Sequence, residues 1–249
     1  MNPYLSNELV AVVVAPFVGS FLALLAGRYG SGRSVLFGRS TCDSCGRMLA
    51  ARDLVPLVSW TFLRGRCRNC GARIDAATVL IELAALIGAV IASATLSGPY
   101  IWAGCILAWW LIAIAAIDAW HLEIPDWLSL PLLLLGLLVA LWQGAWPAFD
   151  SAIGAACGFA AFTVIAWVYR RVRGRVGLGE GDARLLAAAG AWVGWQGLAS
   201  VVLYGAVAAL AYALAAGAVR SSMRPETAVP FGPFLGLGLW ITWISANAG

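Results

Sequence analysis

Two aspartates stand at the edges of strongly apolar stretches of this sequence. Asp118 closes the apolar run 101–117, and Asp182 follows the glycine-rich segment 177–181 and opens another apolar run. Ionisable side chains are rare inside a bilayer and usually serve a function there, with a partner. Two neighbouring carboxyl groups share one proton, so one can take a proton from water while the other donates to a carbonyl oxygen. This chemistry is that of an aspartyl protease. The alternative for each residue alone is a water-facing carboxylate at a helix end, with Asp182 as an N-cap.

Four cysteines form two Cys-x-x-Cys pairs, Cys42 with Cys45 and Cys67 with Cys70, separated by 21 residues. Each pair offers two thiolates to one tetrahedral zinc ion, and a closed four-cysteine site is structural rather than catalytic. Disulfides are the alternative. The surrounding segment is rich in arginine and is therefore expected in the cytoplasm, where thiols stay reduced.

The composition indicates a polytopic membrane protein. Hydrophobic residues make up 62% of the 249 residues, charged residues 11%, and the mean hydropathy is +0.86, against roughly 45–50% apolar residues in soluble domains. The net charge of +4 does not indicate a nucleic-acid partner, because all sixteen basic residues are arginines in three clusters, 28–73, 170–184 and 220–224. Such clusters keep loops in the cytoplasm and contact anionic lipids.

The apolar segments predict an all-α fold of about eight transmembrane helices with a small cytoplasmic zinc-binding loop, because a spanning helix needs about 20 apolar residues. The expected helices are 9–26, 77–96, 100–119, 127–143, 150–169, 183–195, 197–219 and 231–246. The short helix 183–195 requires tilt or local thinning of the bilayer. The N-terminus is expected outside, with every arginine cluster and both aspartates at the cytoplasmic face. Residues 1–26 then form the first transmembrane helix, 27–76 the zinc loop and 77–249 the protease core.

Other acidic residues have local roles in this scheme. Glu82 lies several residues into the second helix, where it should face a polar cavity or a basic partner. Asp126 is expected as the N-cap of the fourth helix and Asp150 as the cap of the fifth. Glu180 is expected to face water.

Glycines precede Asp182 at positions 177, 179 and 181. Residues without a Cβ let the backbone bend and approach a bound peptide closely. We therefore expect Gly177, Gly179 and Gly181 to support the binding of an extended substrate segment.

Short motifs follow one another along almost the whole chain. They are Gly19-Ser20-Phe21-Leu22, Cys42-x-x-Cys45-Gly46, 53–60 with 64–70, Ile81-Glu82-Leu83, Ile117-Asp118 with Ile124-Pro125-Asp126, Gly179-Glu180-Gly181-Asp182, and 229–234. In this order they resemble the motifs of the type IV prepilin peptidases, also called prepilin leader peptidases. Each motif is modest alone, whereas the ordered set is specific.

The resemblance implies an aspartyl endopeptidase of the bacterial inner membrane. Such enzymes cut the short basic leader from type IV prepilins or type II secretion pseudopilins on the cytoplasmic side, and motif matching gives Asp118 and Asp182 as the catalytic pair. Many members also methylate the new N-terminal amine with S-adenosylmethionine, an activity that goes with the four-cysteine loop. The implied partners are these substrates and the lipid bilayer.

Two departures from the family pattern keep alternatives open. Ala23 stands where the family usually has asparagine in the first-helix motif, which is associated with methylation, and Arg184 replaces the usual lysine two positions after the second aspartate. No glycine-rich dinucleotide-type signature offers a separate S-adenosylmethionine site. A cleavage-only peptidase is therefore one alternative. Another is a non-enzymatic zinc-loop membrane protein or transporter, with the two aspartates as a proton relay.

Overall fold

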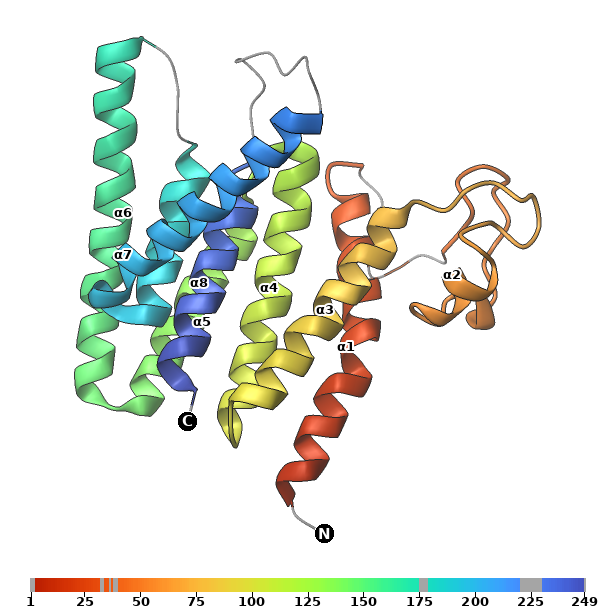
Figure 1. Cartoon of the computed structure of the whole chain (residues 1–249), viewed down its shortest axis with the longest axis horizontal. Coiled ribbons are helices and arrows are strands. Elements are labelled where there is room, and N and C mark those ends of the chain that lie inside the picture. The colour runs from red at the N-terminus through yellow and green to blue at the C-terminus, as the bar shows by residue number, and fades with distance from the viewer. Residues whose placement is uncertain are drawn as a thin grey trace. The chain divides into compact units, whose positions relative to one another are not determined.

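The computed structural model describes residues 3–31, 34–35, 37, 40–174, 179–219 and 230–248. Within them the chain is helical, with two isolated β-bridges in place of any strand. The elements are α1 (Pro3–Arg28), η1 (Ala51–Asp53), α2 (Val58–Phe62), α3 (Ala76–Thr95), α4 (Pro99–His121), α5 (Asp126–Gln143), α6 (Ala145–Arg173), α7 (Glu180–Val219) and α8 (Gly232–Asn247) (Figure 1). Gly177, Val229, Arg175, Arg220 and Arg224 lie outside the described residues.

Two compact units make up the chain, Met1–Ala116 and Ile117–Ala248. The first holds α1, α2, α3 and most of α4, and the second holds the end of α4 with α5 to α8. The division into a first helix, a loop and a core, which rests on the roles of the segments, stays a prediction.

Six helices are long and apolar enough to cross a membrane, namely α1 and α3 to α7. All eight apolar segments expected from the sequence lie in helices of the described residues. The difference in number arises because α7 contains two of the expected segments and α8 has 16 residues. The all-α, multi-pass membrane fold is confirmed.

Gly194 divides α7 into two segments. Its backbone has φ 68° and ψ 178°, a conformation that is essentially restricted to glycine. Figure 1 shows that the segments 180–193 and 195–219 run in opposite directions. The long apolar helix is therefore a hairpin of two passes, which fits the two separate helices expected from the sequence.

Asp150 braces this hairpin and does not cap α6. That helix begins at Ala145, five residues earlier, so the expected capping role is wrong. The carboxylate of Asp150 instead accepts hydrogen bonds from Trp195 Nε1 and Gln196 Nε2, both at 3.2 Å. The acid thus fixes the first residues after the turn.

The first segment of α7 forms the centre of the second unit, and most of its side chains are buried. The helices that pack against α7 are α5, α6 and α8, all in the same unit. The Trp192 indole donates to the Leu132 carbonyl at 2.9 Å and meets Trp243 edge to face at 5.5 Å. With a length of about 21 Å, this segment is short for a bilayer. Neighbouring helices cover its sides, and the tilt or thinning expected from the sequence stays a prediction.

Small residues allow α6 and α7 to touch through their backbones. A Cβ on Gly190 would overlap the carbonyl group of Gly154, and a Cβ on Gly158 would lie 2.5 Å from the Leu186 carbonyl oxygen. The glycine spacings seen in the sequence therefore serve close helix packing.

The first unit packs by the same means. A Cβ on Gly19 of α1 would lie 2.6 Å from Cα of Glu82 in α3. Trp109 of α4 donates its indole N–H to the Ala85 carbonyl at 3.2 Å. The loop between α1 and α3 ends at Asp75, whose carboxylate caps α3 by accepting the Ala77 N–H at 3.0 Å.

We expect Gly190→Ala to destabilise the second unit by about 1–3 kcal/mol, because the added methyl group must push α6 away from α7. The matched control is Gly27→Ala, since a Cβ at Gly27 of α1 would meet no atom of the described residues within 4 Å. Thermal unfolding in detergent measures the difference. Equal melting temperatures for the two variants would contradict the backbone contact.

Candidate active site and metal centre

Asp118 lies in the last turn of α4 and is 5% exposed. Its Oδ2 accepts a hydrogen bond from the backbone N–H of Gly232, the first residue of α8, at 2.9 Å. A Cβ on Gly232 would lie 2.7 Å from this oxygen. A residue without a side chain is therefore required for the α8 backbone to approach the acid this closely.

Asp182 lies in the first turn of α7 and is half-buried. Its Oδ2 accepts the backbone N–H of Gly179 at 3.2 Å. Because α7 begins at Glu180, Asp182 reaches back to the residue before the helix, like the third residue of a capping box, and is not itself the N-cap. Ile124 links the surroundings of the two acids, because it lies against Gly232, which binds Asp118, and against Gly181, the residue before Asp182. The structure thus brings together the two acids singled out in the sequence.

Ile124 fills the space between the backbones that carry these acids. It is 6% exposed, and a Cβ on Gly181 or Gly232 would lie 2.8 or 3.1 Å from its side chain. Gly181 therefore makes room for Ile124, a role that the sequence did not indicate. Among the described residues, a Cβ on Gly179 would meet only Asp182 Oδ2 and Gly181 N within 4 Å, at 3.4 and 3.9 Å, so this exposed glycine leaves space beside the acid.

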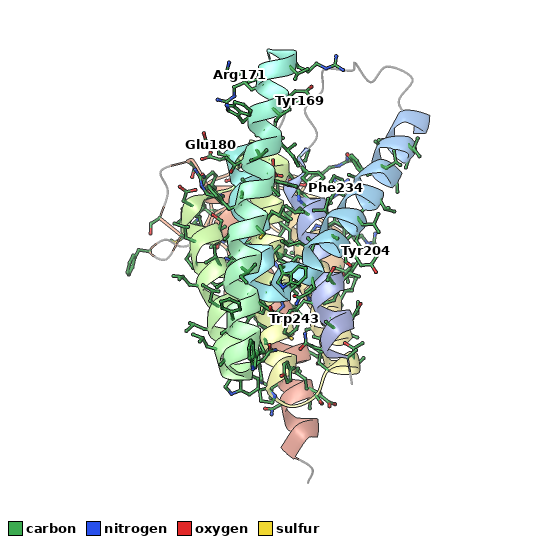
Figure 2. The ribbon with its side chains drawn as sticks, turned by 90° about the vertical axis from the view of Figure 1, so that its left-hand side faces the viewer. Tyr169, Arg171, Glu180, Tyr204, Phe234 and Trp243 are labelled. Atoms are coloured by element: carbon green, nitrogen blue, oxygen red, sulfur yellow. The ribbon has the colours of Figure 1, made fainter. Side chains whose placement is uncertain are left out.

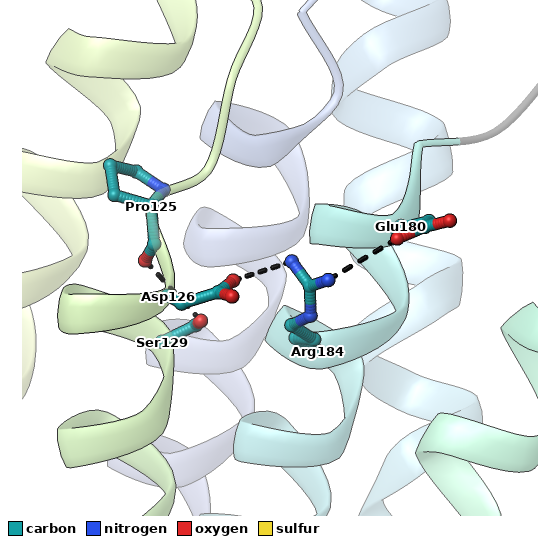
Figure 3. Close-up of polar contacts among 5 residues, drawn as sticks. All are labelled: Pro125, Asp126, Ser129, Glu180 and Arg184. Atoms are coloured by element: carbon teal, nitrogen blue, oxygen red, sulfur yellow. Dashed lines mark hydrogen bonds and ion pairs between the residues drawn. The ribbon is translucent and has the colours of Figure 1, made fainter.

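Arg184 connects the starts of α5 and α7 (Figure 3). Its guanidinium group contacts Asp126 Oδ1 at 2.5 Å and Glu180 Oε2 at 3.3 Å. Asp126 was expected to be the N-cap of its helix, but Pro125 occupies that position and no side chain caps it. Glu180 is 82% exposed, as expected, although it also pairs with Arg184.

Glu82 belongs to the first unit and is 4% exposed. Its partner is neither a cavity nor a basic side chain: Oε2 accepts the backbone N–H of Leu57 at 2.7 Å. Leu57 has φ 60° and ψ −47°, and the Val58 N–H donates to the Pro56 carbonyl at 2.6 Å, which is a rare and strained form of γ-turn. The buried acid therefore holds a strained point of the loop against α3.

The four cysteines expected to bind metal come together on two similar turns. In each, the N–H of a left-handed glycine bonds back to the first cysteine carbonyl, Gly46 to Cys42 at 2.8 Å and Gly71 to Cys67 at 2.9 Å. The four Sγ atoms lie within 4.8 Å of one another. None of the cysteines forms a disulfide. The cluster can hold one metal ion.

Hydrogen bonds to two of these sulfur atoms, those of Cys67 and Cys45, favour the thiolate form that binds metals. The backbone N–H groups of Cys70 and Asn69 lower the pKa of the Cys67 thiol to about 7. The backbone N–H of Arg47 and the amide of Asn69 also lower the pKa of the Cys45 thiol. The distance of 3.8 Å between Cys42 Sγ and Cys70 Sγ matches the roughly 3.8 Å expected between sulfurs around tetrahedral zinc with Zn–S bonds of about 2.3 Å. The donor set fits zinc.

We expect the purified protein to carry one zinc ion per chain, and Cys67→Ser to lose it because three thiolates bind zinc far more weakly than four. Elemental analysis of the folded protein measures the ratio. Cys105→Ser is the matched control, since Cys105 is buried within α4. Full zinc occupancy in Cys67→Ser would contradict the four-cysteine site.

Comparisons with known proteins agree with this arrangement. The family model described as the type IV leader peptidase family matches residues 105–214, and the bacterial peptidase A24 N-terminal domain model matches residues 13–96. No solved structure shows a significant match to the chain.

Three relatives, each named prepilin leader peptidase/N-methyltransferase, illustrate the similarity. The protein from Aeromonas salmonicida (strain A449) is 37% identical over 209 residues, which cover 84% of this chain and 72% of the relative. The protein from Burkholderia pseudomallei (strain 1026b) is 46% identical, with coverages of 80% and 65%. The protein from Stutzerimonas stutzeri is 35% identical, with coverages of 89% and 76%. By sequence along both units, the chain belongs to the type IV leader peptidase family.

Proposed function

We propose that this protein is a membrane aspartyl endopeptidase that removes the leader peptide from type IV prepilins or type II secretion pseudopilins. The observation that carries the proposal is the meeting of Asp118 and Asp182 at the ends of two apolar helices, each held by a glycine N–H. The family and the printed names of the relatives support the same substrate class.

The hydrogen bonds suggest how the pair works. Within the described residues, each carboxyl group uses Oδ2 to accept a glycine N–H, which leaves Oδ1 for water and substrate. One carboxylate takes a proton from the water that attacks the scissile carbonyl, while the protonated partner donates to the carbonyl oxygen. The two acids exchange one shared proton during each turnover.

The open backbone at Gly179 is where an extended peptide can lie beside Asp182. Gly179 is exposed, and beyond the acid itself little would meet a side chain there. Gly181 packs against Ile124 and makes no contact with the substrate in this proposal. Gly179 thus has the substrate-facing role in this proposal, and Gly181 and Arg184 have positioning roles.

The proposed site faces the cytoplasm of a bacterial inner membrane, with the N-terminus outside. In the second unit, Arg170, Arg171 and Arg173 end α6, and Figure 2 shows Tyr169 and Arg171 at the same end as Glu180. The acid pair belongs to this end. Arginine-rich ends stay in the cytoplasm, which supports this orientation.

Methylation of the new N-terminus is the second proposed activity, and the relatives' names support it. S-adenosylmethionine would supply the methyl group. Zinc held by the four cysteines would order the loop, and Glu82 would fix that loop to α3 through Leu57. Ala23 is buried within α1, in the motif where the family usually carries asparagine, so a cleavage-only enzyme is the alternative.

We expect Asp118→Asn and Asp182→Asn each to lower prepilin cleavage by about a hundredfold to ten-thousandfold, because each removes one partner of the proton exchange. Product mass after reconstitution in lipid is the measurement. An added mass of about 14 Da on the wild-type product with S-adenosylmethionine reports methylation. A variant that is inserted, zinc-loaded and fully active would refute the two-aspartate mechanism and favour a relay or scaffold.

We expect Arg184→Gln to lower kcat/KM for cleavage by up to about a hundredfold, because a displacement of about 1 Å at a reacting centre has that effect. The double variant Asp126→Arg/Arg184→Asp should recover part of the loss by restoring the attraction in reverse. Glu180→Gln is the control with little effect, since its contact is longer and more exposed. If the reversed pair is no better than Arg184→Gln alone, the contact with Asp126 does not position the site.

A further inference from the structure

A pocket of about 570 Å³ lies at the base of the zinc loop, in the first unit. Three exposed arginines line it, Arg64, Arg66 and Arg73. Arg66 and Arg73 face each other directly across an isolated antiparallel bridge. Like charges in directly opposed positions destabilise a strand pair, so the loop folds with a concentration of positive charge that needs a counterion.

These three arginines differ from other arginines of the same loop. Arg68 pairs with Asp53 at 2.8 Å, and Arg47 donates to Asn69 at 2.5 Å. Within the part of the chain that the structure describes, the guanidinium groups of Arg64, Arg66 and Arg73 have no ion pair or hydrogen bond. The one acid that lines the pocket is Asp75, and its carboxylate already accepts the Ala77 N–H as the cap of α3. Three positive charges against one negative charge leave the pocket cationic.

Trp60 adds a hydrogen-bond donor to the same pocket. Its indole N–H is buried and lacks a partner in the described residues. The ring packs on Gly65, where a Cβ would lie 2.9 Å from it, so the indole is fixed in place. Buried donors without acceptors are rare in proteins, and an oxyanion in the pocket would supply acceptor oxygens close to this ring.

The position of the pocket identifies the source of the anion. Ala76, which lines it, is the first residue of the apolar span Ala76–Thr95. The start of a spanning helix lies at the level of the lipid headgroups, and arginine binds phosphate through paired N–H donors. We propose that Arg64, Arg66, Arg73 and Trp60 bind the phosphate group of an anionic phospholipid, and so hold the zinc loop at the membrane surface.

The test is titration of the full-length, zinc-loaded protein in detergent with phosphatidylglycerol or phosphatidylcholine, with bound lipid counted by native mass spectrometry. The wild type should prefer phosphatidylglycerol. Arg73→Gln should weaken that binding about fivefold, and the triple variant Arg64→Gln/Arg66→Gln/Arg73→Gln about a hundredfold. Trp60→Phe, which keeps the ring and removes the N–H, should weaken it severalfold. Arg52→Gln is the control with unchanged binding, because it removes an exposed loop arginine outside this pocket.

Zinc content, measured on every variant, separates a local effect from loss of the loop fold. A triple variant that keeps its zinc and still prefers phosphatidylglycerol as strongly as the wild type would overturn the proposal. Inorganic phosphate should fail to displace the lipid at millimolar concentration. Displacement by inorganic phosphate would instead assign the pocket to a soluble phosphate and refute the lipid assignment.

Discussion

The burial of a carboxyl group inside an apolar helical unit is the constraint on which the site depends. A buried carboxyl needs hydrogen bonds or a charged partner, because its transfer from water is otherwise very costly. Asp118 meets this need with the N–H of Gly232 at 2.9 Å. That bond requires the start of α8 to touch the end of α4, and this in turn requires glycine at the contact. The chemistry of one side chain therefore dictates how closely the helices of the second unit approach.

The first segment of α7, residues 180–193, is also held in place by contacts along its length. At one end Arg184 links it to the first residue of α5, and at the other Asp150 binds the two residues after the Gly194 turn. Between these ends, glycines let α6 lie directly on the backbone of α7. Asp182 is thus carried by a short helix held at both ends and along one side. Such rigid support suits the proposed mechanism, in which the two acids keep a fixed separation and share a proton.

Local patterns in the sequence were enough to place the helices, to single out Asp118 and Asp182 and to predict that the four cysteines come together. Each of these is marked by neighbouring residues: an apolar run of spanning length, an acid at its edge, or a Cys-x-x-Cys spacing. The residues that acidic side chains contact in the folded protein were not predictable from such local patterns. Asp126 and Arg184 are 58 positions apart, and Asp126 follows a proline in a pattern typical of helix caps. The contacts of Gly181 with Ile124 and of Glu82 with the backbone of Leu57 were not predictable for the same reason, because tertiary packing alone makes them.

The four-cysteine loop and the two aspartates are held in place by different kinds of interaction. Among residues 40–75 only Pro56, Gly65 and Cys67 are buried, so the loop has almost no apolar core. A segment of this size needs a metal or another cross-link to hold one fold. The four cysteines are placed to hold one metal ion and so can supply that cross-link, and the hydrogen bond from the Leu57 N–H to Glu82 attaches the loop to α3. The hydrogen bonds of Asp118 and Asp182, by contrast, come from Gly232 and Gly179 of their own unit. A metal ion held by the four cysteines would therefore order the loop, whereas the geometry of the acids depends on helix packing.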